Sequence, residues 1–157
     1  MACRRVLSLW FPRLAAERAL RLERGLTDRP LAIVRRVGNL QTLCSLSRAA
    51  EAEGVHHGQG LQDARAICPD LLTRAEDPRA QAAFLAAVRR WAGKFSPWVA
   101  EEGAVGLMLD LTGCAHLFGG EAALARQAEQ ECAAQGLTVQ LGLADTAGAA
   151  WALARFA

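Results

Sequence analysis

The chain has 157 residues, of which 52% are hydrophobic and 22% charged, so it can bury the core of one globular domain carrying a small insert. Its 18 basic and 16 acidic residues leave a net charge of +2, which excludes a strongly basic nucleic-acid or membrane binder. No apolar run approaches the roughly 18 residues of a membrane span, and the first residues lack a signal-peptide core, so we expect a cytoplasmic protein.

The predicted elements begin with an apolar strand over 6–10, which Pro12 ends. A helix is expected from there to about Gly25, because glycine suits the residue that follows a helix. Two β-rich runs separated by a glycine-containing turn then predict a hairpin over 31–36 and 40–46.

The next elements are short. Ser47 is the predicted N-cap of a helix over 48–53, and a glycine-rich loop over 54–60 follows it. A two-turn helix is expected over 61–68, and a brief strand over 71–73.

The second half of the chain contains the clearest helical pattern. Asp77-Pro78 predicts a capped helix to Lys94. Its expected apolar face holds Phe84, Val88, Trp91 and Phe95. The remaining elements expected in chain order are strands over 97–101 and 105–111, a helix over 121–135, a strand over 137–144 and a helix capped by Asp145-Thr146.

The order of these elements indicates the fold class. Without residues 13–75 the chain reads strand, helix, strand, strand, helix, strand, helix, which is a split βαββαβ arrangement. We therefore predict an α/β (α+β) fold, with a ferredoxin-like sheet domain over 1–12 and 76–157 and a small α/β module inserted over 13–75.

The five cysteines are scattered, and none forms a Cys-x-x-Cys pair. Disulfide frameworks and zinc sites both need closer or paired cysteines. We expect reduced and mostly buried thiols at Cys3, Cys44, Cys68, Cys114 and Cys132.

Several short motifs follow the same order as those of a known family. They occupy 7–12, 54–58, 64–70, 107–112 and 141–144. Together they resemble the Y-family (UmuC/DinB-like) DNA polymerases, in which the sheet domain is the palm and the insert is the fingers. The resemblance implies a polymerase palm with a fingers module, truncated at the C-terminus, so that the chain is a fragment.

The residues that this resemblance implies for catalysis are absent. The family holds two magnesium ions with an aspartate of the first strand and a later Asp-Glu pair, which correspond to Leu7 and to Val105-Gly106. A second aspartate corresponds to Leu9. Hydrocarbon cannot ligate magnesium, which requires oxygen ligands. We therefore predict an inactive polymerase homologue, a pseudoenzyme with no metal and no other cofactor.

Three further family positions differ. The aromatic residue that the family stacks under the nucleotide sugar corresponds to Pro12, and the fingers residues that grip the triphosphate correspond to Arg48 and Glu51. A carboxylate at the latter position repels phosphate. Trp10 is expected to fill the space that the metals and the nucleotide would occupy.

The pattern best resembles the non-catalytic, ImuB-type branch of the family, on the runs 9–14 and 110–121. This implies an accessory protein in DNA damage tolerance and induced mutagenesis (translesion synthesis). The implied partners are DNA, bound weakly by this fragment, and a sliding clamp, a RecA-like partner and an error-prone polymerase, bound mostly through regions outside this chain.

Arg35, Arg36 and Arg48 of the predicted fingers are the candidate DNA contacts, because arginine suits phosphate groups. Arginines on an edge strand are equally explained by solubility.

Two other functions stay open. Asp110 with Glu101 and Glu102 would form a displaced metal site in an active translesion polymerase, although carboxylates beside a turn are usually only solvated. An unrelated ferredoxin-like regulatory domain would have neither fingers nor DNA affinity.

Other chemistry-bearing residues favour plainer roles. A metal site at His56-His57 with Cys68 is weak, because adjacent side chains on an extended loop point apart. Cys114 beside His116 lacks the orienting carboxylate of a catalytic dyad.

Overall fold

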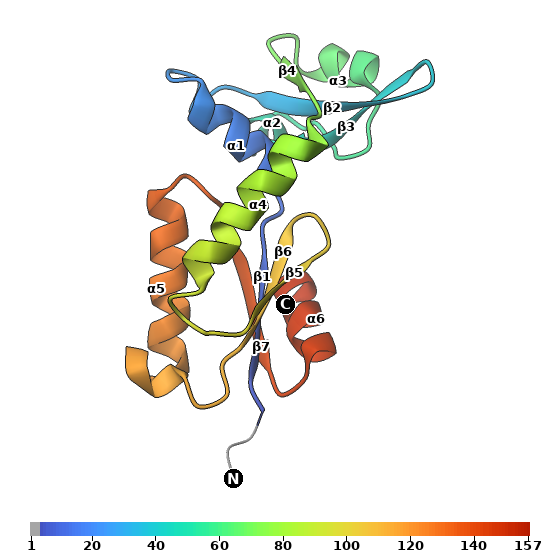
Figure 1. Cartoon of the computed structure of the whole chain (residues 1–157). Coiled ribbons are helices and arrows are strands. Elements are labelled where there is room, and N and C mark those ends of the chain that lie inside the picture. The colour runs from blue at the N-terminus through green and yellow to red at the C-terminus, as the bar shows by residue number, and fades with distance from the viewer. Residues whose placement is uncertain (1–3) are drawn as a thin grey trace. The chain divides into compact units, whose positions relative to one another are not determined.

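The computed structural model describes residues 4–157 as two structural units (Figure 1). The chain up to Pro12 and Ala82–Ala157 form one, which we call the split unit, and Arg13–Gln81 form the other, the inserted unit. Cys3 lies outside the described residues.

The split unit is built on a four-stranded sheet in the order β5-β6-β1-β7, in which every neighbouring pair is antiparallel. Its strands are β1 (Val6–Trp10), β5 (Val99–Glu102), β6 (Gly106–Asp110) and β7 (Gln140–Ala144). Its helices are α4 (Pro78–Ala92, which begins in the inserted unit), the 3₁₀ helix η1 (Ala115–Phe118), α5 (Glu121–Ala134) and α6 (Ala147–Phe156). This is the predicted split βαββαβ order, and the α/β fold class is confirmed.

Helices α5 and α6 lie on opposite sides of this sheet (Figure 1). Leu7 pairs with Leu109, and because paired residues point to the same face, both side chains belong to one fully buried leucine-rich layer. Ser8 and Gly142 pair on the other face, which α6 covers. A Cβ at Gly142 would lie 2.1 Å from the backbone oxygen of Ala150, so the absence of a side chain permits this close approach.

The expected apolar face of α4 is partly wrong. The buried residues of the helix are Leu85, Val88 and Ala92. The Trp91 ring lies at the margin of the core, because its indole N–H donates a hydrogen bond to Glu131 at 2.9 Å. Phe95 is buried but follows the end of the helix, where its ring contacts that of Phe118 at a centroid distance of 5.2 Å.

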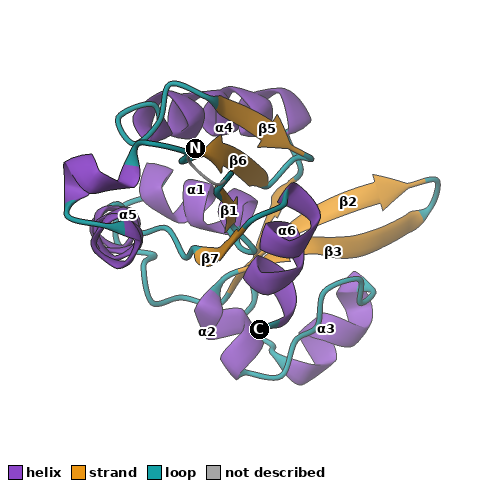
Figure 2. Cartoon of the chain, turned by 90° about the horizontal axis from the view of Figure 1, so that it is seen from below, coloured by secondary structure: helices purple, strands orange, loops and turns teal. Residues whose placement is uncertain are grey.

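The inserted unit has a three-stranded sheet in the order β3-β2-β4, with β2 antiparallel to β3 and parallel to β4. Its strands are β2 (Leu31–Val37), β3 (Leu40–Leu46) and β4 (Leu72–Ala75), and its helices are α1 (Leu14–Leu22), α2 (Arg48–Ala52) and α3 (Leu61–Ile67). Figure 2 shows α1 on one side of the β2–β3 hairpin and α2 and α3 on the other. This sheet has a hydrophobic core on each face, and alternate residues of β2 belong to different cores. Leu31 and Ile33 pack with α1, whereas Ala32 and Val34 pack on the side of α2 and α3.

The predicted hairpin and the predicted Ser47 cap are both confirmed. The Ser47 hydroxyl accepts hydrogen bonds from the backbone N–H of Ala50 at 3.2 Å and of Leu31 at 2.9 Å. Helix α1 is shorter than expected and ends before Glu23, whose backbone is extended and whose carboxylate accepts a hydrogen bond from Arg74 of β4 at 2.7 Å. The helix therefore ends before Gly25, at a residue that pairs with β4 instead of continuing the helix.

Within residues 4–157, no helix is both long enough and apolar enough to cross a membrane. The four described cysteines are free thiols, with Cys68 and Cys132 buried and Cys44 and Cys114 half-buried.

Candidate functional site

The family positions for metal ligands lie on β1 and at the start of β6. Leu7 is fully buried and pairs with Leu109, whereas Gly106 pairs with Trp10. Val105 contributes a backbone contact, since its carbonyl accepts a hydrogen bond from the Phe11 N–H at 2.9 Å. The sheet register therefore places Trp10, and not Leu7, directly across from Gly106.

The space beside Gly106 is occupied. A Cβ built there would lie 2.7 Å from both the backbone oxygen and the Oε2 atom of Glu102, and 3.3 Å from Nη2 of Arg155. Contacts this short to backbone require a shift of the chain, so no carboxylate-bearing side chain fits at this position. The residues at 7, 105 and 106 supply no side-chain oxygen, and they do not fit the magnesium ions that the family implies.

An ion pair fills this space. Nη2 of Arg155 donates a hydrogen bond to Glu102 Oε2 at 2.8 Å, and its guanidinium carbon lies 5.4 Å from the Trp10 ring centre and 4.6 Å from that of Trp151. The Arg155 side chain is only 11% exposed. Trp10, the residue expected to fill the space of the missing metals, is half-buried, and the Arg155 guanidinium lies over its ring.

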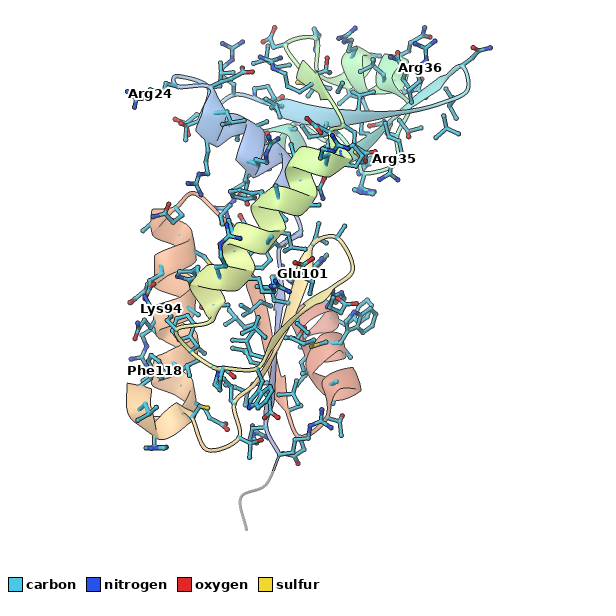
Figure 3. The ribbon with its side chains drawn as sticks, in the orientation of Figure 1. Arg24, Arg35, Arg36, Lys94, Glu101 and Phe118 are labelled. Atoms are coloured by element: carbon cyan, nitrogen blue, oxygen red, sulfur yellow. The ribbon has the colours of Figure 1, made fainter. Side chains whose placement is uncertain are left out.

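The carboxylates considered for a displaced metal site are held separately. Asp110 lies at the far end of β6, paired with Val6, while Glu102 pairs with Gly106. Hydrogen bonds from Thr112 hold the pKa of the Asp110 carboxyl below its ordinary value. Figure 3 labels Glu101, whose carboxylate lies 3.8 Å from Nε of Arg89. Among the described residues, no group of three or more His, Cys, Asp or Glu side chains is arranged to hold a metal ion.

Arg35 and Arg36 do not share a face of the β2–β3 hairpin, because neighbouring residues of a strand point to opposite sides (Figure 3). Nη2 of Arg35 pairs with Glu76 at 2.8 Å, and this contact lowers the pKa of the Glu76 carboxyl. Nε of Arg36 donates a hydrogen bond to the backbone oxygen of Gly38 at 3.2 Å, near the hairpin tip.

The two fingers positions implied for the triphosphate lie on α2. Arg48 begins the helix and is exposed, and Glu51 forms an ion pair with Arg13 just before α1. Glu51 is therefore neutralised within the inserted unit.

The other candidates have structural contacts. A ring nitrogen of His57 lies 2.8 Å from the backbone oxygen of Cys44. Cys68, the residue that follows α3, is buried in the hydrophobic core, so the two do not form a ligand set. Cys114 Sγ contacts the Thr112 carbonyl at 3.7 Å, and His116 is an exposed residue of η1. Burial and the neighbouring Glu76 carboxylate raise the pKa of the Cys44 thiol to about 11, which disfavours a nucleophilic role.

Sequence reasoning missed the contacts of Arg155. The spacing of Trp151 and Arg155 places both on one face of α6 and was a usable signal for their contact. The partner Glu102 is 53 positions earlier, and no local pattern indicates it. Arg5 was also missed, although it pairs with both Glu121 and Asp145.

Comparisons with known proteins identify related sequences. The family model described as the impB/mucB/samB family matches residues 9–155. Protein ImuB of Caulobacter vibrioides, from strain NA1000 / CB15N, is 50% identical over 103 residues, which are 66% of this chain and 22% of that protein.

Solved polymerase structures show the same fold. The insertion ternary complex of Dbh DNA polymerase is 21% identical, with a TM-score of 0.83 over 96% of this chain and 45% of that one. DinB from Sulfolobus solfataricus is 20% identical, with a TM-score of 0.77 over 96% of this chain and 45% of that one. The chain thus spans about a fifth of the length of the curated relatives and under half of these solved chains.

Proposed function

Because the chain belongs to the impB/mucB/samB family, whose model matches residues 9–155, we propose that it is a catalytically inactive relative of the Y-family DNA polymerases. It acts in DNA damage tolerance through DNA and protein contacts. In this proposal residues 1–12 and 76–157 are a palm, and residues 13–75 are a fingers module.

The main support for the proposal is that position 106, where the family has a metal-binding carboxylate, is a glycine with no room for a side chain. Nucleotidyl transfer depends on metal ions that stabilise both the attacking and the leaving oxygen. At Gly106 there is no side chain to bind such an ion, and an added Cβ would lie 2.7 Å from Glu102 and 3.3 Å from Nη2 of Arg155. The buried hydrocarbon of Leu7 removes a second ligand.

The alternative of an active polymerase with displaced ligands is less well supported. It would need Glu101, Glu102 and Asp110 to converge, whereas each is engaged by a different partner. The alternative of an unrelated regulatory domain is set aside, because the family match covers nearly the whole chain.

The partners and the location are part of the proposal. Arg36 and Arg48 are exposed on the inserted unit, and arginine suits contact with DNA phosphates. The third candidate, Arg35, forms an ion pair with Glu76. The relative named Protein ImuB supports a role beside other damage-tolerance proteins. A sliding clamp, a RecA-like partner and an error-prone polymerase would bind mostly through regions outside this chain, in the cytoplasm.

Primer extension on purified protein tests the absence of catalysis. We expect no nucleotide addition to a primed template with Mg²⁺ or Mn²⁺ and all four deoxynucleotides. The double variant Glu102→Gln with Asp110→Asn is the matched control. Extension by the wild-type chain that this variant loses would overturn the proposal, whereas extension that persists in the variant identifies a contaminating polymerase.

A further inference from the structure

Helix α1 exposes one large apolar residue among arginines. Leu22, the last residue of the helix, is 68% exposed. Residues three and four positions apart in a helix are neighbours on its surface, so Arg18 lies beside both Arg21 and Leu22. Arg24 follows just after the helix and is exposed at one end of the inserted unit (Figure 3). We call Arg18, Arg21, Leu22 and Arg24 the α1 surface.

The positive charge of the α1 surface is not neutralised within the inserted unit. Among the described residues, neither Arg18 nor Arg24 forms an ion pair. The acid between them in the outer part of the segment, Glu23, is already paired with Arg74 of β4, and Glu17 is buried. The surface therefore presents an excess of positive charge around an exposed leucine.

We propose that the α1 surface binds an acidic segment of a protein partner, with Leu22 as the apolar anchor of the contact. Guanidinium groups form charge-assisted hydrogen bonds with carboxylates, so Asp or Glu side chains complement the arginines. An exposed apolar side chain is stabilised on binding only where the partner covers it with apolar atoms. A segment that carries both acids and apolar side chains meets both requirements. This inference goes beyond the proposed function, because it assigns a protein-binding surface to the inserted unit.

Nucleic acid is the competing ligand, because phosphate groups also attract arginine. A phosphate backbone offers no apolar pocket for Leu22, and leucine has no aromatic ring on which a base can stack. Figure 3 shows Arg24 and Arg36 at opposite ends of the inserted unit, so the α1 surface is separate from the hairpin tip that carries Arg36. A protein partner is therefore favoured, and DNA binding becomes an outcome of the test.

Fluorescence anisotropy with two labelled synthetic peptides tests the apolar anchor. One peptide consists of glutamate and leucine, with the leucines in helical spacing, and the other has serine in place of every leucine, so both carry the same charge. We expect wild type to bind the leucine peptide about tenfold more tightly than the serine peptide. Leu22→Ser should abolish this difference. Leu117→Ser, which removes a 73% exposed leucine of the split unit, should preserve it.

The variant Arg18→Gln with Arg24→Gln tests the charge. It should weaken binding of both peptides about fivefold, because contacts with two carboxylates are lost. Arg90→Gln with Arg126→Gln is the matched control, since both are exposed arginines of the split unit and their replacement removes the same charge. Circular dichroism checks that each variant is folded.

Several outcomes would overturn the inference. They are equal binding of the two peptides to wild type, unchanged binding by the α1 variants, or equal losses in the control variants. A labelled oligo-dT strand that binds more tightly than the leucine peptide, and loses affinity in the Arg18 and Arg24 double variant, would identify DNA as the ligand and also overturn it. Metal-dependent primer extension would end the proposed function and leave this inference standing.

Discussion

Nε of Arg5 donates a hydrogen bond to Glu121 Oε2 at 2.8 Å, which ties the residue before β1 to the first turn of α5, 116 positions further along the chain. Nη2 of Arg5 reaches the second carboxylate oxygen of Glu121 at 3.0 Å, and Nη1 reaches Asp145 at 2.6 Å. One guanidinium therefore links the start of β1, α5 and the turn that precedes α6. The ion pair with Glu121 is part-buried, whereas Asp145 is 76% exposed.

This arrangement predicts unequal effects of removing the two acids. Glu121→Gln should lower the Tm in thermal unfolding more than Asp145→Asn, because the Glu121 pair is bidentate and less screened by water. The Arg5→Met variant removes both contacts and should lower the Tm by more than Asp145→Asn and by at least as much as Glu121→Gln. Equal effects of the two acid variants would contradict the prediction.

Glu131 predicts a pH-dependent contribution to stability. Hydrogen bonds from Lys94, then Trp91 and Gln127, lower the pKa of its carboxyl from 4.5 to about 2. Because the folded-state pKa is depressed, the stabilisation is complete above pH ~4.5 and is lost as the pH falls towards about 2.

Urea unfolding over a pH series tests this expectation. The difference in free energy of unfolding between wild type and Glu131→Gln should be constant above pH ~5 and shrink below it. Glu129→Gln is a matched control, because Glu129 is an exposed neighbour on the same helix. A difference that persists unchanged to pH 2 would show that the pKa of Glu131 is not depressed.

Gly142 predicts a large cost for one methyl group. A Cβ there would lie 2.1 Å from the Ala150 backbone oxygen and 2.4 Å from the Ala154 nitrogen, so Gly142→Ala must push α6 away from the sheet. We expect a loss of about 1–3 kcal/mol in free energy of unfolding. The control is Gly148→Ala, in α6 itself, where no atom lies within 4 Å of the added carbon. This variant should be neutral or stabilising by up to ~1 kcal/mol. Similar values for both variants would refute this packing argument.

We expect the Cys44 thiol to be unreactive, because the neighbouring Glu76 carboxylate disfavours its ionisation. Its pKa is raised to about 11 by burial and by Glu76, whose Oε2 lies 3.2 Å from Sγ. Glu76→Gln should therefore increase alkylation of Cys44 by iodoacetamide at pH 9, measured for each cysteine by mass spectrometry, because more thiolate forms. Alkylation of Cys114, in the other unit, should not change and serves as the internal reference. A decrease at Cys44 would mean that Glu76 does not suppress its ionisation.

The fingers arginines predict a difference in salt dependence of DNA binding. Arg36→Ala should weaken binding to single-stranded or primed DNA and reduce the slope of log K against log salt by up to ~1, because one phosphate contact is lost. Arg35→Ala should have a smaller effect, since Glu76 already pairs with Arg35. Fluorescence anisotropy over a salt series measures both, with Arg126→Ala as the control for loss of one charge. If Arg35→Ala weakened DNA binding more than Arg36→Ala, Arg35 and not Arg36 would be the phosphate contact.

The sequence alone determined the local structure and the type of side chain at each candidate site position. Ser47 predicted a cap, the turn after Val37 predicted a hairpin, and the order of strands and helices predicted the split sheet, because caps, turns and periodicity act over a few residues. The absence of side-chain oxygen at Leu7 and Gly106 was equally readable, since it depends on residue type and not on geometry.

The tertiary structure alone decided which charges meet. The partners of Arg5 and Arg155 lie 116 and 53 positions away, and only the tertiary packing of α5 and α6 brings them together. The buried stripe of α4 was likewise decided by packing, because a period of 3.6 residues does not distinguish two adjacent apolar stripes of one helix. The sequence thus showed that positions 7, 105 and 106 carry no side-chain oxygen, whereas the folded chain showed that Glu102 and the Arg155 guanidinium lie beside Gly106.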